Sequence, residues 1–194
     1  MKRLILFLLA ICSFTMIYAQ KWGDLLTEEE HNYTDKDLDY AFSIPSSRFV
    51  GKKWFTNKSN YFWFNQNGTG KFVQIQYDTD YGDTINITKT VPFTWKRDGL
   101  ELYISFLQNQ ITYLPVASEL KKFSPRVQND IKKEYAQIQQ RLRNQTYNKQ
   151  HIKFKKFTND FIICDLYSNG SFQDGLNLLS QKKKDEAMKR IGMK

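Results

Sequence analysis

Short apolar runs alternate with turn residues across residues 49–106, and no other part of the chain is patterned as strongly. Residues 60–65 contain four consecutive aromatic side chains, which predict a strand that is apolar on both faces. The following Asn67-Gly68-Thr69-Gly70 predicts a hairpin turn, because Gly and Asn tolerate positive φ. Residues 71–78 then alternate apolar and polar side chains, which is typical of a half-buried strand. Its two faces carry Val73, Ile75 and Tyr77 on one side and Gln74 and Gln76 on the other.

The next predicted strand, residues 85–95, carries its large apolar side chains at odd positions. They are Ile85, Ile87, Val91, Phe93 and Trp95. Lys89 interrupts this series, and Pro92 cannot donate a hydrogen bond to a neighbouring strand. We therefore expect a bulge or an edge position between these two residues.

Residues 100–106 form a clean apolar face after a turn at Arg97-Asp98-Gly99, and a weaker strand is predicted within residues 110–116. Short strands separated by tight turns indicate an antiparallel meander, hence a sandwich or a barrel. Closure into a barrel removes exposed strand edges. A barrel of about eight strands has room for a filled core or for a small ligand.

A long amphipathic helix is predicted at about residues 125–145. Ser124 is a good N-cap, and Pro125 suits the first helical position. Apolar side chains recur at helical spacing along one stripe, formed by Val127, Ile131, Tyr135, Ile138 and Leu142. We expect this stripe to dock on the sheet, the alternative being a helix that binds a membrane surface or a partner.

The chain after this helix predicts one or two strands over residues 151–167 and a second helix from about Leu176. Residues 49–175 are thus predicted to form one domain with a mainly β fold and flanking α-helices. Residues 176–194 form a basic C-terminal helix or tail, and residues 20–48 form an acidic leader that wraps the barrel or stays loose. Thr27 and Glu30 fit a capping box, which predicts a short helix in that leader.

Residues 1–19 have the layout of a secretory signal peptide, with Lys2 and Arg3 before an apolar run. That run is short for a membrane span, so the mature chain is expected to be exported, to the periplasm or beyond the cell, without a transmembrane segment. Lipoprotein anchoring through Cys12 is not expected, because Ile11 stands where a lipoprotein signal needs a small residue. Cys164 lies in an apolar run and is expected to be a buried, inert thiol.

The chain has a net charge of +9, and its bases gather in the last third, where residues 119–194 carry seventeen bases and eight acids. The basic surface is expected at Lys153, Lys155, Lys156, Lys182, Lys183 and Lys184. It would suit an anionic envelope polymer or a protein partner, or it simply keeps the protein dispersed. No specific nucleic-acid motif is present.

Catalytic motifs of the common hydrolases and nucleotide-binding enzymes are absent from the sequence. Its two histidines, His31 and His151, are far apart and share no motif. Asp78 and Asp80 would form a catalytic carboxylate pair only if the fold brought them to a cleft. We therefore expect no enzyme activity, no cofactor and no metal site.

The meander resembles the small exported lipocalin-like (calycin-type) β-barrel proteins of Gram-negative bacteria. The resemblance covers about 60 residues and rests on Phe49-Val50-Gly51-Lys52-Lys53-Trp54, on residues 62–70, on Phe93-Thr94-Trp95 and on residues 100–104. It implies an up-and-down antiparallel barrel with the Trp54 ring closing one end, and a cavity for an apolar small molecule. The sequence departs from the family in having two residues between Gly51 and Trp54, and in offering Lys155 and Lys156 where the family stacks an Arg on that Trp.

The function predicted from the sequence is therefore that of a non-enzymatic binding protein. The candidate ligand-binding residues in the barrel interior are Trp54, Phe62, Phe64, Tyr77, Phe93 and Trp95. The alternative is that these rings fill the barrel completely.

Overall fold

A computed structural model describes residues 25–147 and 149–191. The predicted signal peptide and Cys12 lie outside these residues. The strands are β1 (Lys53–Phe55), β2 (Tyr61–Phe64), β3 (Thr69–Asp78), β4 (Ile85–Asp98), β5 (Glu101–Phe106), β6 (Thr112–Pro115), β7 (Gln150–Phe157), β8 (Phe161–Ser168) and β9 (Ser171–Leu179). The α-helices are α3 (Glu28–His31), α4 (Asp35–Ser43), α5 (Ala117–Leu120), α6 (Pro125–Arg143) and α7 (Gln181–Arg190). Two short 3-10 turns are η1 (Ser46–Arg48) and η2 (Gln108–Gln110).

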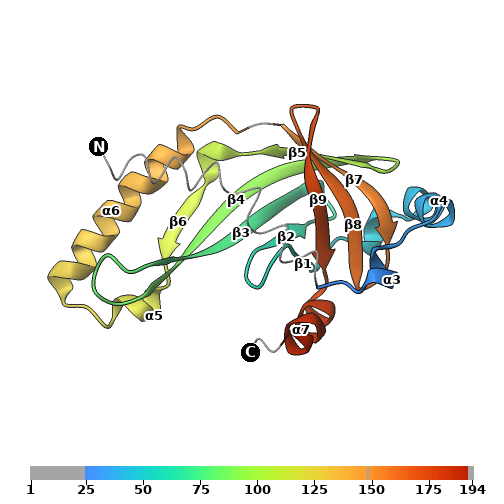
Figure 1. Cartoon of the computed structure of the whole chain (residues 1–194). Coiled ribbons are helices and arrows are strands. Elements are labelled where there is room, and N and C mark those ends of the chain that lie inside the picture. The colour runs from blue at the N-terminus through green and yellow to red at the C-terminus, as the bar shows by residue number, and fades with distance from the viewer. Residues whose placement is uncertain (1–24, 148, 192–194) are drawn as a thin grey trace.

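Eight of the strands close into an antiparallel up-and-down barrel (Figure 1). Each barrel strand pairs with the next along the chain, β5 pairs with β7, and β9 returns to β1. The remaining strand, β6, pairs only with β4. The predicted mainly β barrel with a long helix and a C-terminal helix is confirmed.

The barrel is tight at one end and splayed at the other. Phe55 of β1 pairs with Leu179 of β9, and this is the register contact that joins the first strand to the last. β2 pairs with β3 over residues 70–73, whereas β3 pairs with β4 over residues 69–78. The far half of β3 and the near half of β4 therefore extend beyond β2, and with β6 they form a three-stranded extension of the barrel wall (Figure 1).

β4 is a continuous strand, so the bulge expected between Lys89 and Pro92 is absent. Its register with β3 is unbroken from Ile85 to Thr94. The expected edge position is closer to what is observed. The side of β4 away from β3 pairs with β6 over residues 87–90 and with β5 over residues 93–98, and residues 91–92 between them have no partner in register on that side. Pro92 falls in the gap between these two partners, where a missing N–H costs no ladder hydrogen bond.

Aromatic rings fill the tight end of the barrel. Trp54 and Phe93 are fully buried, and the Trp54 indole N–H donates to the Phe49 carbonyl at 2.7 Å. Phe64 packs against Phe93 with ring centroids 5.4 Å apart. Gly70 lies beside them with no room for a side chain, because a Cβ there would meet the Phe93 ring at 2.3 Å.

Helix α6 lies against the three-stranded extension, as the apolar stripe predicts (Figure 1). Its N-cap is Ser124, whose hydroxyl accepts a hydrogen bond from the Val127 N–H, and Pro125 is its first residue. Four residues of the predicted stripe are buried, namely Ile131, Tyr135, Ile138 and Leu142. Polar contacts fix the register, since the Tyr113 N–H of β6 donates to Gln139 Oε1 at 2.9 Å.

The acidic leader packs on the barrel. Helix α3 begins with the predicted capping box of Thr27 and Glu30. Ala41 of α4 and Ile44 are buried in the core of the tight end. The guanidinium of Arg97 donates to the carbonyls of Ala41 and Ile44, which are acceptors at the end of α4.

The C-terminal helix starts later than expected. Leu176 to Leu179 belong to β9, so the barrel runs four residues past the predicted boundary at residue 175. Ser180 then caps α7, its hydroxyl accepting from the Lys183 N–H at 3.2 Å. Leu178 and Leu179 are fully buried, and this burial, which the strand pairing provides, overrides the helical spacing seen in the sequence.

Candidate functional site

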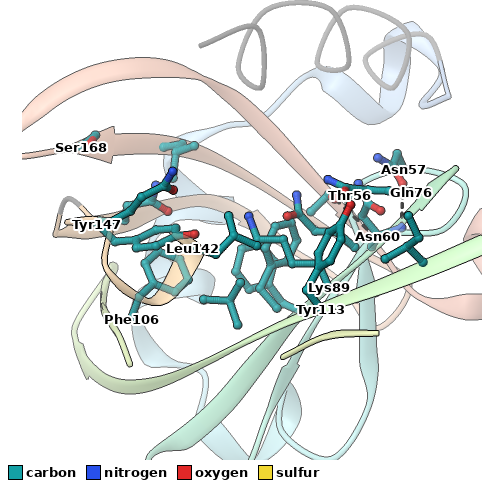
Figure 2. Close-up of a pocket in the computed structure, with 18 of the residues that line it drawn as sticks. Thr56, Asn57, Asn60, Gln76, Lys89, Phe106, Tyr113, Leu142, Tyr147 and Ser168 are labelled. Atoms are coloured by element: carbon teal, nitrogen blue, oxygen red, sulfur yellow. Dashed lines mark hydrogen bonds between the residues drawn. The ribbon is translucent and has the colours of Figure 1, made fainter. Parts of the chain in front are cut away.

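A pocket of about 880 Å³ occupies the splayed end of the barrel. Its walls come from β3, β4 and the end of β5 on one side, from the end of β8 and the middle of β9 on the other, and from α6 and the segment after it. Figure 2 shows a division of its lining, with Phe106, Leu142 and Tyr147 at one end and Thr56, Asn57, Asn60 and Gln76 at the other. Ser168 also lies at the same end as Tyr147, so the first end is mainly rather than wholly apolar. We call the two ends the apolar end and the amide-rich end.

The apolar end is built around Tyr147, in the segment after α6. Its ring lies 5.9 Å from that of Phe106, centroid to centroid. Burial raises the pKa of its hydroxyl. The hydroxyl oxygen is buried and has no hydrogen-bond partner among the described residues, although buried polar atoms are nearly always paired.

Lys89 reaches the pocket from the middle of β4. It is paired in register with Gln74 of β3, and both side chains lie on the inner face of the barrel wall. The Lys89 ammonium nitrogen lies 5.7 Å from the centroid of the Tyr147 ring. Burial lowers the pKa of Lys89 to about 8, because an apolar environment disfavours the charged form.

The amide-rich end lies where β3 leaves β2. Asn60 Oδ1 accepts a hydrogen bond from the Ile75 N–H at 3.0 Å and so replaces the missing strand partner. Asn57 Oδ1 accepts from the N–H groups of Ser59 and Asn60, which fixes the loop between β1 and β2. Gln74 is 3% exposed, so a polar side chain is buried at the centre of this wall.

Tyrosines bind the acidic side chains on the α6 side of the pocket. The Tyr135 hydroxyl donates to Asp78 Oδ2 at 2.5 Å, and the Tyr81 hydroxyl donates to Glu134. Burial, and then the charge of Asp78, raise the pKa of Tyr113 to about 12. The hydroxyl groups of these tyrosines stay protonated at neutral pH, and those of Tyr135 and Tyr81 act as hydrogen-bond donors.

The six candidate ligand-binding residues divide between the packed end and the pocket. Trp54, Phe64 and Phe93 are buried in the core of the tight end, and Trp95 packs against that core. Phe62 belongs to that core and also lines the pocket, and Tyr77 lines the pocket with 64% of its surface exposed. The pocket thus lies mainly beyond the residues expected to form it, since rings from opposite walls meet and fill the narrow end.

The pairing of β3 with its neighbours reverses the faces expected for that strand. Gln74 and Gln76 face the same way as Phe72 and the inward residues of β4, and Tyr77 is at the surface. Sequence reasoning also missed Lys89, although one signal was there. A lysine at an inward position of an otherwise apolar strand indicates either an irregular strand, with a bulge or an edge, or a polar group inside a cavity. The sequence pattern favours the irregular strand, whereas the structure shows the polar group in a cavity.

The base near the Trp54 ring is Lys52, whose ammonium lies 4.6 Å from the ring centroid. The two lysines that the family resemblance offered are engaged elsewhere. Lys155 forms a 2.8 Å ion pair with Asp165, and Lys156 donates to the Asn32 carbonyl at 2.8 Å.

The other lysines of the expected basic surface also have partners in the chain. Lys153 pairs with Glu101 at 3.6 Å, and Lys182 pairs with Asp160 at 3.6 Å. Lys183 and Lys184 pair with Glu30 and Asp185, respectively. The pairs of Lys153 and Lys182 are exposed and therefore weak, whereas Lys183 is largely buried against Glu30. The exposed pairs do not exclude binding of a polyanion, and the structure adds nothing in favour of such binding.

The comparisons with known proteins give no assignment: the chain matches no family model, no curated protein and no solved structure. Within the described residues there is no helix long and apolar enough to cross a membrane. Cys164 is fully buried, and burial raises the pKa of its thiol.

Proposed function

We propose that this chain is an exported, non-enzymatic binding protein that takes a small, largely apolar molecule in the pocket at the splayed end of its barrel. Its relation to the lipocalin-like proteins is part of this proposal, and the closed up-and-down barrel supports it. The observation that carries the proposal is the pocket volume of about 880 Å³. Small-molecule sites have volumes of roughly 300 to 1,000 Å³ and mostly apolar walls with a few polar groups.

The contrast with the tight end of the same barrel supports a binding role. Core side chains normally pack with few voids larger than a water molecule. Rings fill the tight end in this way, whereas the splayed end keeps a volume that Phe106, Ile138 and Leu142 leave open. An apolar ligand would complete the packing of that end.

The direct test is a fluorescence titration with N-phenyl-1-naphthylamine, a neutral probe that brightens in apolar surroundings. A filled variant, Gln76→Trp with Ser168→Trp, places two indoles in the pocket from positions that lie apart in Figure 2. A matched control, Lys71→Trp with Lys96→Trp, places them on the exposed outer face of β3 and β4. We expect saturable binding by the wild type and the control, and at least a fivefold loss of affinity in the filled variant.

Equal affinity in all three proteins, or no saturable binding, would contradict the proposal. Turnover of generic esters or glycosides that is lost on changing Asp78 or Asp80, both of which line the pocket, would favour an enzyme instead. Binding to an anionic polymer that weakens steeply with salt would favour the basic surface. Export is tested separately by the mass of the mature chain, which is expected to begin at Gln20.

A further inference from the structure

Two hydrogen-bond donors occur at the Tyr147 ring inside the pocket. One is the Tyr147 hydroxyl, which is buried and has no partner among the described residues. The other is the Lys89 ammonium, 5.7 Å from the centroid of the Tyr147 ring. Both residues line the pocket, and Lys89 is the one base among the described residues that do so.

A buried hydroxyl without a partner is costly, and native structures keep such a group only where something else satisfies it. The Tyr147 hydroxyl can donate or accept a hydrogen bond, whereas the Lys89 ammonium can only donate, so a ligand atom shared by both groups must be an acceptor. Because a charged lysine lies beside the same ring, the acceptor that suits both groups is an anionic oxygen. A carboxylate has two such oxygens and can accept from both donors at once.

Asp78, one of the acidic residues that line the pocket, is separated from Lys89 along the strands. Lys89 is in register with Gln74, and Asp78 stands four residues farther along β3, about 13 Å away at the usual rise of a strand. Asp78 also accepts from Tyr135. Glu134 on α6 accepts from Tyr81, and Asp174 on β9 accepts from the Gly175 N–H. An anionic group near Lys89 is therefore separated along the wall from Asp78, and three of the pocket's acids are already hydrogen-bonded.

Apolar side chains also line the pocket on the Tyr147 side. Phe106 packs on the Tyr147 ring, Leu142 lies on the same side of the pocket (Figure 2), and Ile138, one turn before Leu142 on α6, also lines the pocket. Their apolar surface lowers the local dielectric constant, which strengthens a charge-assisted hydrogen bond. They also provide a surface for an apolar ligand body next to the donors.

We infer that the pocket takes an amphipathic organic acid, whose acidic group accepts hydrogen bonds from Tyr147 Oη and Lys89 Nζ while its apolar body lies along Phe106, Ile138 and Leu142. This inference rests on the proposed function, since it names the chemical class of the ligand for the same pocket. The lowered pKa of Lys89 is consistent with it, because a bound anion would offset the effect of burial.

The test compares two probes that differ by one acidic group, neutral N-phenyl-1-naphthylamine and anionic 8-anilino-1-naphthalenesulfonate. The wild type should bind the anion more tightly than the neutral probe. Lys89→Met should lower the affinity for the anionic probe by about tenfold or more, and Tyr147→Phe should lower it by roughly three- to tenfold. Lys89→Arg should keep most of that affinity, because it keeps the positive charge. Neither Lys89→Met nor Tyr147→Phe should change the affinity for the neutral probe by more than about twofold.

Two controls separate a binding effect from a general one. Lys71→Met removes a base from the outer face of β3 and should leave the affinity for both probes unchanged, which excludes a long-range charge effect. Tyr147→Phe should leave the melting temperature unchanged or raise it, because the hydroxyl makes no hydrogen bond within the described residues.

A carboxylate version of the test uses displacement of the neutral probe by dodecanoate and by dodecanol. Stronger displacement by dodecanoate that disappears in Lys89→Met supports the inference, and equal displacement overturns it. If the neutral probe binds in the pocket and neither Lys89→Met nor Tyr147→Phe changes the affinity for the anionic probe, the acid assignment fails and the proposed function stands. If the neutral probe does not bind, or binds the filled variant with the affinity of the wild type, the proposed function itself fails.

Discussion

The two ends of the barrel are built from the same strands and differ in how their walls are covered. At the tight end, β1, β2, β7 and the second half of β4 bring large rings together, and Trp54 and Phe93 have no exposed surface. At the splayed end, β3 and the first half of β4 continue past β2, and α6 covers the inner face of this extended wall, the face that carries Ile87, Lys89 and Val91. A helix packed on the extended wall leaves a space between itself and the barrel, which facing strands would have filled with their side chains.

This difference shows why a row of inward aromatic residues does not by itself mark a ligand site. Rings that face one another across a narrow barrel satisfy each other, as Phe64 and Phe93 do. The pocket is marked by polar side chains on the inner wall, Gln74 and Lys89, which a packed core would not hold. The tight end should therefore respond to substitutions as a filled apolar core, and the splayed end as an open wall with a buried charge.

The largest effect is expected from a matched pair of leucine truncations. Leu102→Ala at the tight end should lower the free energy of unfolding by about 4 kcal/mol, since it opens a new cavity in a filled core. Leu142→Ala in the pocket wall should cost about 2 kcal/mol, because one side of Leu142 already faces empty space. Urea denaturation of both variants measures the difference, and equal costs would show that the two ends are packed alike.

A pair of glycine substitutions tests the same contrast through added volume. Gly70→Ala should destabilise the protein by about 2 to 3 kcal/mol, because its Cβ would lie 2.3 Å from the Phe93 ring. Gly175→Ala, beside the pocket, should change stability by less than about 0.5 kcal/mol, because a Cβ there meets nothing within 4 Å. Thermal melting of both variants is sufficient, and a stable Gly70→Ala protein would contradict a filled tight end.

The charge at the splayed end is tested by the pH dependence of Lys89→Met. Burial lowers the pKa of Lys89 in the folded protein to about 8 from 10.5, so between these values the unfolded chain binds more protons and the wild type gains stability as pH rises. Below pH 8 the variant should be more stable than the wild type by on the order of 1 to 3 kcal/mol. That advantage should shrink as pH rises toward 10.5, and a pH-independent difference would place Lys89 in water.

The smallest effect is expected where α6 is tied to the extended wall. Tyr135→Phe removes the hydrogen bond to Asp78 and should cost about 1 kcal/mol. Hydrogen exchange should quicken in α6 and β6 and stay unchanged in β7 and β8, if the extension opens separately from the barrel. Equal acceleration in all four elements would show that the two ends unfold as one unit.

Much of the fold could be predicted because it depends on local patterns. The Thr27 and Ser124 caps, the apolar stripe of α6 and the alternation in β5 are short-range features, and each leads to the structure observed. The start of α7 was misplaced because Leu176 and Leu179 fit a helical spacing as well as a strand. Pairing with β8 decides between the two, and that pairing joins separate segments of chain.

The sequence by itself determined the class of this protein: short strands with tight turns, one long amphipathic helix, and enough inward apolar side chains to close a barrel. Only the tertiary structure decided which face of β3 points inward, which rings fill space, and that Lys89 enters a pocket beside Tyr147. The physical reason is that local patterns set the elements, whereas register and the distance between opposite walls set where volume is left. These depend on contacts between residues far apart in the chain, such as β3 with β4 and α6 with β6.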